Sequence, residues 1–480
     1  MNFTNDKIEI ISIIDSIFET PNNDYDVCLN RFTLKINDNF LDNRGKYLRH
    51  EILSDLTLKN SFKLLSNICN DKTMMCSNCP VKKYCNSFIL NTRLTIPKDS
   101  YKIIDLFCGA GGLSLGFKQE GFYIVLANDI EECCIDTYSH NHPEIHRNNV
   151  ILGDINNIIP QINELVNFQH IDVIVGGPPC QGFSMANRQR LIDDPRNKLY
   201  RSYLEIVQKI KPTFFVMENV KGMKSVAKEV QEDFSKIGYV LTYKVLNAKD
   251  FGIPQNRERL IYIGNNINID NELVFKEIEL YANKQKNFVL EDALFALRPL
   301  KANNKKNSTE IGDLESGYKI EKNIYIKSNE YLNIINSGHK SNIVFNHKAR
   351  YNNSRDIEIF SRLEQGNKSD DPKIADIMPY QRRNGIFKDK YYKLINNKIC
   401  KTITAHMKFD CNMYIHPTQA RGLTPREAAR VQSFPDDYFF RGAYTKTYMQ
   451  IGNSVPPLLG RAIAHSIKKF LNKGCNNNEF

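Results

Sequence analysis

The sequence has no long hydrophobic run, no leader-like start and no internal repeat. None of its apolar stretches approaches the length that a membrane-spanning helix needs, so we expect no membrane partner. The first residues, MNFTNDKIEIISIIDSIF, carry acidic side chains within the apolar stretch and have no small-residue cleavage site, which argues against a signal peptide. These absences together favour a cytoplasmic protein.

The composition is that of a folded, basic protein. With 480 residues, 41% of them hydrophobic and 10% aromatic, the chain is long enough for two or three packed domains. The net charge of +11 suits a polyanion, because lysine and arginine gain affinity by releasing counterions from phosphates. An AT-rich genome would also enrich a sequence in lysine, asparagine and isoleucine, so charge alone leaves a nucleic-acid partner open.

Short β-branched runs begin at Tyr101 and alternate with helical stretches. Strands are expected over 101–107, 122–129, 171–177, 212–219 and 259–264, and helices over 199–210 and 227–238, among others. This alternation predicts an α/β domain with a parallel sheet covered on both faces. In such sheets a ligand binds beyond the carboxyl ends of the strands.

The unusual residues of the sequence fall at those carboxyl ends. CGAGG follows the first run, but its glycines, at positions 109, 111, 112 and 116, lack the GxGxxG spacing of dinucleotide-binding turns. Asp129 could bond a ribose hydroxyl and Asp154 an adenine amino group, although each could equally cap a helix. Together with the glycine turn, they favour an adenosyl cofactor.

Cys180 follows two prolines at the end of another expected strand, in GGPPCQGFS. A lone cysteine is usually structural, but this context places a thiol at the ligand edge, where its thiolate is a good nucleophile. Glu218, at the next strand end, is either a helix cap or an acid that could protonate a heterocycle. Arg257 and Arg259 are two residues apart and share a face in extended sequence, so both guanidiniums could address one base or phosphate.

These motifs, in this order, resemble the cytosine-C5 DNA methyltransferases over roughly residues 101–264 and 400–470. PPCQGFS, MENV, PQNRER, RGLTPREAARVQSFPDDY and QIGNSVPP all look like blocks of that family. The resemblance implies a Rossmann-like, S-adenosylmethionine-dependent methyltransferase sheet with a smaller target recognition domain. It implies that Cys180 is the nucleophile, that Glu218 protonates cytosine N3, and that Arg257 and Arg259 hold the cytosine and the catalytic loop. It also implies cofactor contacts from Phe107, Gly109, Gly112, Asp129, Ile130, Asp154, Leu199 and Asn453.

Two of these positions depart from the family's pattern. Asp129 stands where the family usually has Glu, which shortens the reach to the ribose. Ile130 stands where Trp is frequent, which weakens the expected stacking on adenine. The polar, basic stretch 182–196 is the candidate closing loop, because the target cytosine must leave the duplex to react.

The expected organisation has four parts. A mainly helical N-terminal unit spans residues 1–98, the cofactor-binding and catalytic domain 99–264, the target recognition domain 265–420, and a C-terminal segment that returns to the catalytic domain 421–480. The recognition domain includes a basic, Tyr-bearing segment, 379–394, suited to phosphate and base contacts, and ends near the TITA element at 402–405.

We therefore expect a monomeric enzyme that acts on double-stranded DNA beside a cognate restriction endonuclease. The rival functions are a tRNA cytosine methyltransferase with the same core and a non-catalytic DNA-binding regulator. The long region after PQNRER favours DNA over tRNA. The intact Cys180 and Glu218 argue against a regulator.

Four of the twelve cysteines lie within 17 residues, at Cys69, Cys76, Cys79 and Cys85. Four thiolates so close together can bind a zinc ion. The intervals of six, two and five residues resemble the iron–sulfur loop of endonuclease-III-type DNA glycosylases, which implies a [4Fe–4S] cluster with zinc as the alternative. Lys82 and Lys83 inside the loop would suit a contact with the DNA backbone.

Overall fold

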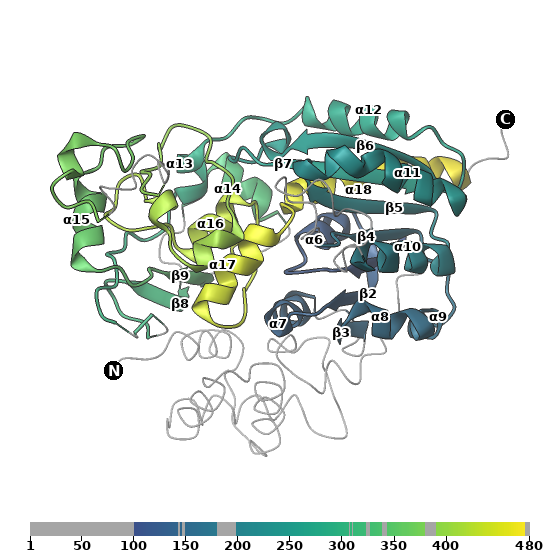
Figure 1. The fold of residues 1–480 in the computed structure, drawn as a ribbon, viewed down its shortest axis with the longest axis horizontal. Coiled ribbons are helices and arrows are strands. Elements are labelled where there is room, and N and C mark those ends of the chain that lie inside the picture. Colours follow the sequence, from purple (N-terminus) through teal and green to yellow (C-terminus); the bar gives the residue numbers. More distant parts are fainter. Residues whose placement is uncertain are drawn as a thin grey trace, which may run out of the picture.

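The computed structural model describes residues 100–475, apart from 143–144, 146–148, 180–197, 307, 310, 323–326, 338–342 and 380–389. The N-terminal unit with its four cysteines, Cys180 and the candidate closing loop therefore lie outside the described residues. The described chain forms two lobes, one built on a large sheet and the other on short helices, loops and a small sheet (Figure 1).

The larger lobe contains a seven-stranded sheet of order β3-β2-β1-β4-β5-β7-β6. Strand order reverses between β1 and β4, which is where α/β sheets open a ligand crevice. The strands are β1 (Lys102–Leu106), β2 (Tyr123–Asp129), β3 (Val150–Leu152), β4 (Val173–Gly176), β5 (Phe214–Val220), β6 (Val240–Asn247) and β7 (Glu258–Asn265).

The expectation of a parallel sheet is wrong for one strand, because β7 runs antiparallel to both β5 and β6. Only residues 248–257 join β6 to β7, and they include a 3-10 turn, η7 (Ala248–Phe251). A parallel neighbour needs a crossover of a dozen or more residues, so this short connection returns the chain in the opposite direction.

Alternating side chains of each strand enter two separate cores, one on each face of the sheet. Ile103 and Val173 pack with α6 (Gly112–Gln119) and its neighbours, whereas Ile104 and Ile174 pack on the opposite face. The helices of the first face also include α12 (Asn271–Ala282) and α18 (Pro457–Cys475). Those of the second face are α8 (Ile155–Ile158), α9 (Ile162–Leu165), α10 (Lys198–Ile210) and α11 (Ala227–Lys236).

The smaller lobe surrounds a two-stranded antiparallel sheet of β8 (Gly317–Lys322) and β9 (Ile343–Lys348). Its own apolar cluster includes Ile359, Phe360 and Tyr391. The helices around it are α13 (Leu290–Leu294), α14 (Glu330–Ile335), α15 (Ser354–Arg362), α16 (Pro425–Val431) and α17 (Tyr444–Asn453). Shorter turns are η8 (Pro372–Ile374), η10 (Ala405–Lys408) and η11 (Asn412–Tyr414).

The segment 421–480 is divided between the lobes. Its helices α16 and α17 pack with β9, α13 and η10, whereas α18 packs along α6 and α12 against the large sheet (Figure 1). Glycine permits the close crossing of α6 and α18, because a Cβ on Gly116 would lie 2.3 Å from the backbone nitrogen of Arg461. Among the described residues, no helix is long and apolar enough to cross a membrane.

Candidate active site

A glycine turn links β1 to α6 at the carboxyl edge of the sheet. Phe107, Gly109 and Gly111 all have positive φ, and Gly111 is the N-cap of α6. A Cβ on Gly109 would meet nothing within 4 Å, whereas one on Gly112 would lie 2.1 Å from the carbonyl oxygen of Val455. The turn is thus open at Gly109 and closely packed at Gly112, and the amino end of a helix lies directly behind it.

Asp129 is joined to this turn. Its Oδ2 accepts from the Gly109 NH at 2.8 Å, and its Oδ1 accepts from the Glu131 NH at 2.9 Å. Burial raises the pKa of the Asp129 carboxyl above its ordinary value. Both oxygens already have backbone donors, so the aspartate side chain stabilises the turn.

The remaining expected cofactor residues lie at or next to the ends of strands and helices. Ile130 directly follows β2 and is 69% exposed. Asp154 is exposed at the start of α8, where its side chain accepts from the Asn156 NH at 2.9 Å. Leu199 is half-buried in the first turn of α10, and Asn453 is exposed at the last residue of α17.

Glu218 and Arg259 form the clearest polar pair of the site. They lie on the adjacent strands β5 and β7, and Nε of Arg259 is 2.8 Å from Oε1 of Glu218. The backbone that leads toward residue 180 runs beside this pair, because a Cβ on Gly177 would lie 3.0 Å from Oε2 of Glu218. Asn219 holds the same segment by donating to the Pro178 carbonyl at 3.1 Å.

Arg257 has partners quite different from those of Arg259. It is completely buried and donates to the carbonyl oxygens of Ile403, Gly452 and Ser454. Burial, followed by the nearby charge of Arg259, lowers the pKa of its guanidinium below the ordinary value. The two arginines were expected to address the same base or phosphate, but only Arg259 is paired with Glu218.

A buried polar group beneath the glycine turn escaped the sequence analysis. Asp105 accepts from the Tyr138 hydroxyl at 3.1 Å, and that hydroxyl lies 2.9 Å from Oγ of Ser114. Burial raises the pKa of Asp105 to about 7. An aspartate within the apolar run KIIDLF is the signal that could have revealed it, since a buried carboxyl requires hydrogen-bonding partners.

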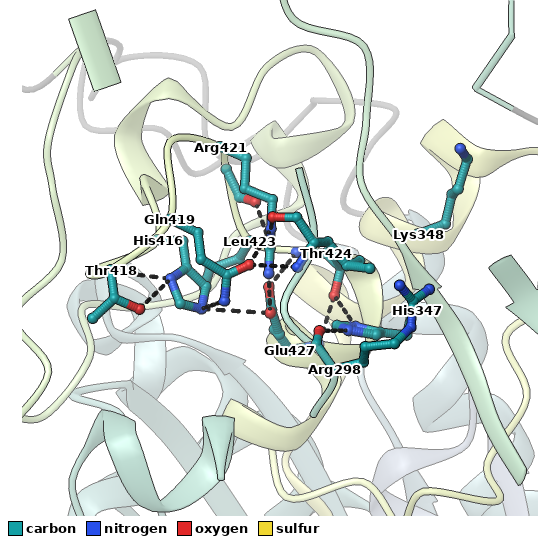
Figure 2. Close-up of polar contacts among 12 residues, drawn as sticks. Arg298, His347, Lys348, His416, Thr418, Gln419, Arg421, Leu423, Thr424 and Glu427 are labelled. Atoms are coloured by element: carbon teal, nitrogen blue, oxygen red, sulfur yellow. Dashed lines mark hydrogen bonds and ion pairs between the residues drawn. The ribbon is translucent and has the colours of Figure 1, made fainter. Parts of the chain in front are cut away.

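A second polar group missed by the sequence analysis lies in the smaller lobe. Figure 2 shows Glu427 between Arg421 and His416, and the Arg421 guanidinium donates to both carboxylate oxygens at 2.6 and 2.7 Å. Thr424 and Glu427 form a capping box at the start of α16, a signal present in TPRE. Burial lowers the pKa of His416 to about 3 and that of His347 to about 4, so both rings are neutral at pH 7.

The described residues contain no group of three or more His, Cys, Asp or Glu side chains that could bind a metal ion. The four cysteines expected to bind one lie in the N-terminal region, outside those residues.

Residues 101–469 match the family described as C-5 cytosine-specific DNA methylase. The chain belongs to this family. The match includes the glycine turn, the Glu218–Arg259 pair and Asn453, and it begins after the four-cysteine loop.

The relatives are proteins of similar extent. The chain is 33% identical over 397 residues to the type II methyltransferase M1.HphI of Haemophilus parahaemolyticus, covering 80% of this chain and 91% of that protein. It is 33% identical over 392 residues to M.DdeI of Desulfomicrobium norvegicum, covering 76% and 88%. A crystal structure of an E. coli prophage protein assigned to the DNA modification methyltransferases is 26% identical, with a TM-score of 0.59 over 78% of this chain and 100% of that one.

The protein is therefore an enzyme, a DNA (cytosine-5-)-methyltransferase, and S-adenosylmethionine is the methyl donor expected of its family. The chemistry of the crevice fits that cofactor. There is open space beside Gly109, where a Cβ would meet nothing within 4 Å, and Ile130 and Asn453 are both exposed.

Proposed function

We propose that this enzyme methylates C5 of a flipped-out cytosine within a specific sequence of double-stranded DNA, through a covalent Cys180 adduct. The observation that carries the proposal is the Glu218–Arg259 pair, which lies beside the segment Gly177–Pro179. The next residue along the chain is Cys180. Cys180 is three residues beyond Gly177, so its Cα is at most roughly 11 Å from that of the glycine that lies against Glu218. A thiol nucleophile and a carboxyl group that can protonate the base are therefore within reach of one ring.

The residue types match what cytosine requires. C5 of cytosine is too weakly nucleophilic to attack a sulfonium methyl unaided. Addition of the Cys180 thiolate to C6, with N3 protonated by Glu218, gives an enamine whose C5 carries electron density. C5 takes the methyl, and loss of its proton with expulsion of the thiolate restores the aromatic ring. A stacked base is inaccessible to these groups, so the cytosine must leave the duplex, at a cost of a few kcal/mol.

Each chain residue of the cofactor site has a definite task in this proposal. S-adenosylmethionine, when bound, supplies an activated methyl group. The glycine turn admits the ligand to the backbone, Asp129 and Asp154 orient polar groups of its adenosyl part, and Ile130 offers an apolar contact. The rest of the site is lined by Phe107, Leu199 and Asn453.

The biological setting is modification of DNA within a type II restriction–modification pair. Two relatives with about a third of their residues identical to this chain are type II methyltransferases. The net charge of +11 suits the phosphate backbone. A cognate endonuclease that cuts the same sequence is the partner this setting implies, and region 265–420 is where we place recognition of that sequence.

The test of the mechanism is the Cys180→Ser variant. It should lose methyl transfer yet bind S-adenosylhomocysteine with unchanged affinity, because the cofactor residues lie elsewhere. DNA containing 5-fluorocytosine should trap the unaltered enzyme covalently, since C5 then has no removable proton. Cys133→Ser, at a half-exposed cysteine of α7 (Glu132–Asn141), is the matched control and should still be trapped. Methylation by the Cys180 variant, or trapping at another cysteine, would disprove the covalent mechanism.

We also propose that Cys69, Cys76, Cys79 and Cys85 hold a [4Fe–4S] cluster that supports a DNA-contacting loop. The support is the spacing of the cysteines beside Lys82 and Lys83. Methyl transfer involves no net electron transfer, so the cluster's role would be structural.

Anaerobically purified enzyme should be brown, absorb at about 400 nm and contain about four irons per chain. Cys79→Ala should lose the iron and weaken DNA binding while leaving cofactor binding intact. Cys28→Ala is the matched control, and it should retain the iron. Stoichiometric zinc without iron, after anaerobic expression with iron supplied, would decide for a zinc site.

A further inference from the structure

Arg257 is a buried cation held by backbone rather than by a carboxylate. Its Nη1 donates to the Ile403 carbonyl at 2.6 Å, and its Nη2 donates to the carbonyls of Gly452 and Ser454, both at 2.9 Å. The side chain is fully buried, and no carboxylate in the described ranges lies within ion-pair distance of it. A solvent-excluded arginine with three backbone acceptors is fixed in place and cannot reach out to a base.

Two of the three acceptors lie at the carboxyl end of α17. The helix ends at Asn453, with Ser454 as its C-cap. The last carbonyls of a helix lack intrahelical partners and carry the negative end of its dipole, so a cation there is stabilised without a carboxylate. Arg257 therefore fixes the geometry of the helix end on both sides of Asn453.

The third acceptor belongs to a chain segment that packs directly against this helix end. A Cβ on Gly452 would lie 2.2 Å from the backbone nitrogen of Ala405, so the two backbones are in contact there. Gln255, two residues before Arg257, reinforces the junction. Its Oε1 accepts from the Ile403 NH at 2.7 Å, and its Nε2 donates to Gln432 at 2.8 Å.

Gln432 completes the connection by donating to the Ile451 carbonyl at 2.8 Å. Gln255, Arg257 and Gln432 are all fully buried. The segments around Ile403 and Asn453 are thus joined by a network with no solvent access, so a displacement of one must disturb the other.

We infer that Arg257 is a positioning residue for the methyl donor, holding Asn453 toward the cofactor and coupling it to the segment 402–405. Asn453 is the exposed residue between the two helix-end acceptors, so its side chain is presented outward from a backbone that Arg257 fixes. Arg259, paired with Glu218, serves the base instead. This inference rests on the proposed cofactor site. It gives Arg257 and Arg259 different roles, whereas their PQNRER motif suggested one shared role.

The test compares three lysine substitutions, which retain charge but lose the forked guanidinium. Arg257→Lys should raise the Kd for S-adenosylhomocysteine, measured by calorimetry, by about threefold to tenfold. The loss of one charged hydrogen bond sets the upper limit, because Arg257 acts on the cofactor only through Asn453. It should also raise KM for the methyl donor while kcat at saturating donor falls less. Arg259→Lys should lower kcat and leave that Kd unchanged.

Arg350→Lys is the matched control for a lost arginine–carbonyl contact. Arg350 donates to the carbonyls of Met407 and Phe409, both at 2.9 Å, and neither carbonyl belongs to α17. Its substitution should leave the Kd for S-adenosylhomocysteine unchanged. A folded Arg257→Lys enzyme with unaltered cofactor affinity and a lower kcat would overturn the inference and return Arg257 to the base.

Hydrogen–deuterium exchange on the unaltered enzyme tests the coupling even if Arg257→Lys does not fold. Saturating S-adenosylhomocysteine should slow exchange in peptides covering 400–407 as well as 450–458. Protection of 450–458 alone would overturn the coupling. An unaltered enzyme that binds no S-adenosylhomocysteine would instead overturn the proposed cofactor site itself.

Discussion

Asp105→Asn removes a carboxyl group that lies in β1, directly beneath the glycine turn. Asp105 is 2% exposed and has the hydroxyl of Tyr138 as its donor, with Ser114 beside that hydroxyl. Burial raises its pKa from 3.8 to about 7. The folded enzyme therefore holds a proton on Asp105 at pH values where the unfolded chain has released it.

The sign of the effect follows from this proton. Between pH 3.8 and about 7 the folded state binds more protons than the unfolded state, so the contribution of Asp105 to stability falls as pH rises through this window. Each pKa unit corresponds to 1.36 kcal/mol, so the contribution lost by pH 8 is roughly 4 kcal/mol. Asparagine is neutral at every pH and can still accept from Tyr138, so the variant should escape this loss.

The assay is urea unfolding of both proteins at a series of pH values from 5 to 8.5, with circular dichroism as the measure of unfolding. The difference in unfolding free energy, Asp105→Asn minus unaltered enzyme, should become more positive as pH rises and level off above pH 7. If the new amide changes the unfolding free energy by the same amount at every pH, the dependence of this difference on pH stays the same. Glu164→Gln, at an exposed position of α9, is the control for a lost surface charge and should give a flat difference. A flat difference for Asp105→Asn would refute the reasoning.

Other perturbations test separate parts of the molecule. Glu427→Gln leaves buried Arg421 without a charged partner and should lower the free energy of unfolding by about 3–5 kcal/mol. Thermal unfolding should show this as a large fall in Tm, and an unchanged Tm would contradict the burial of the pair. Gly116→Ala forces a methyl group against the backbone of α18 and should destabilise by about 1–3 kcal/mol or more in the same assay. Ile130→Trp should lower the Kd for S-adenosylhomocysteine by enlarging the apolar contact, and weaker binding in calorimetry would argue against adenine stacking there. Exchange of region 265–420 with that of a related enzyme should change the methylated sequence in a bisulfite map, and an unchanged sequence in an active chimera would place recognition elsewhere.

The large sheet could be predicted from local patterns, because a strand buried on both faces must be apolar along its whole length. The runs at 101–107, 122–129, 171–177 and 212–219 became β1, β2, β4 and β5 for that reason. Strand β6 escaped notice, because its sequence VLTYKVLN is partly polar and its side chains are mostly half-buried. The direction of β7 depended on the length of a connection rather than on the strand's own residues.

The gathering of Gly109, Asp129, Gly177 and Glu218 at one edge also followed from the sequence, because the carboxyl ends of parallel strands meet there. Asp129 and Gly109 are bonded to each other, and Gly177 lies against Glu218. The contacts of each side chain at that edge could not be predicted from the sequence. The spacing of two arginines in extended sequence suggested one shared target, yet a two-residue spacing fixes only the side from which they leave the backbone.

The sequence by itself determined the order of the strands' motifs, the residue types of the crevice and the family they resemble, since these depend on short-range patterns. Only the tertiary structure decided the partners of Arg257, which come from Ile403, Gly452 and Ser454, all more than 140 residues away along the chain. It likewise decided the raised pKa of Asp105, because burial is a property of everything that packs around a carboxyl group. Hydrogen-bond acceptors brought together by folding leave no periodic signal in a sequence, and that is why the partners of this buried arginine could be read only from the folded chain.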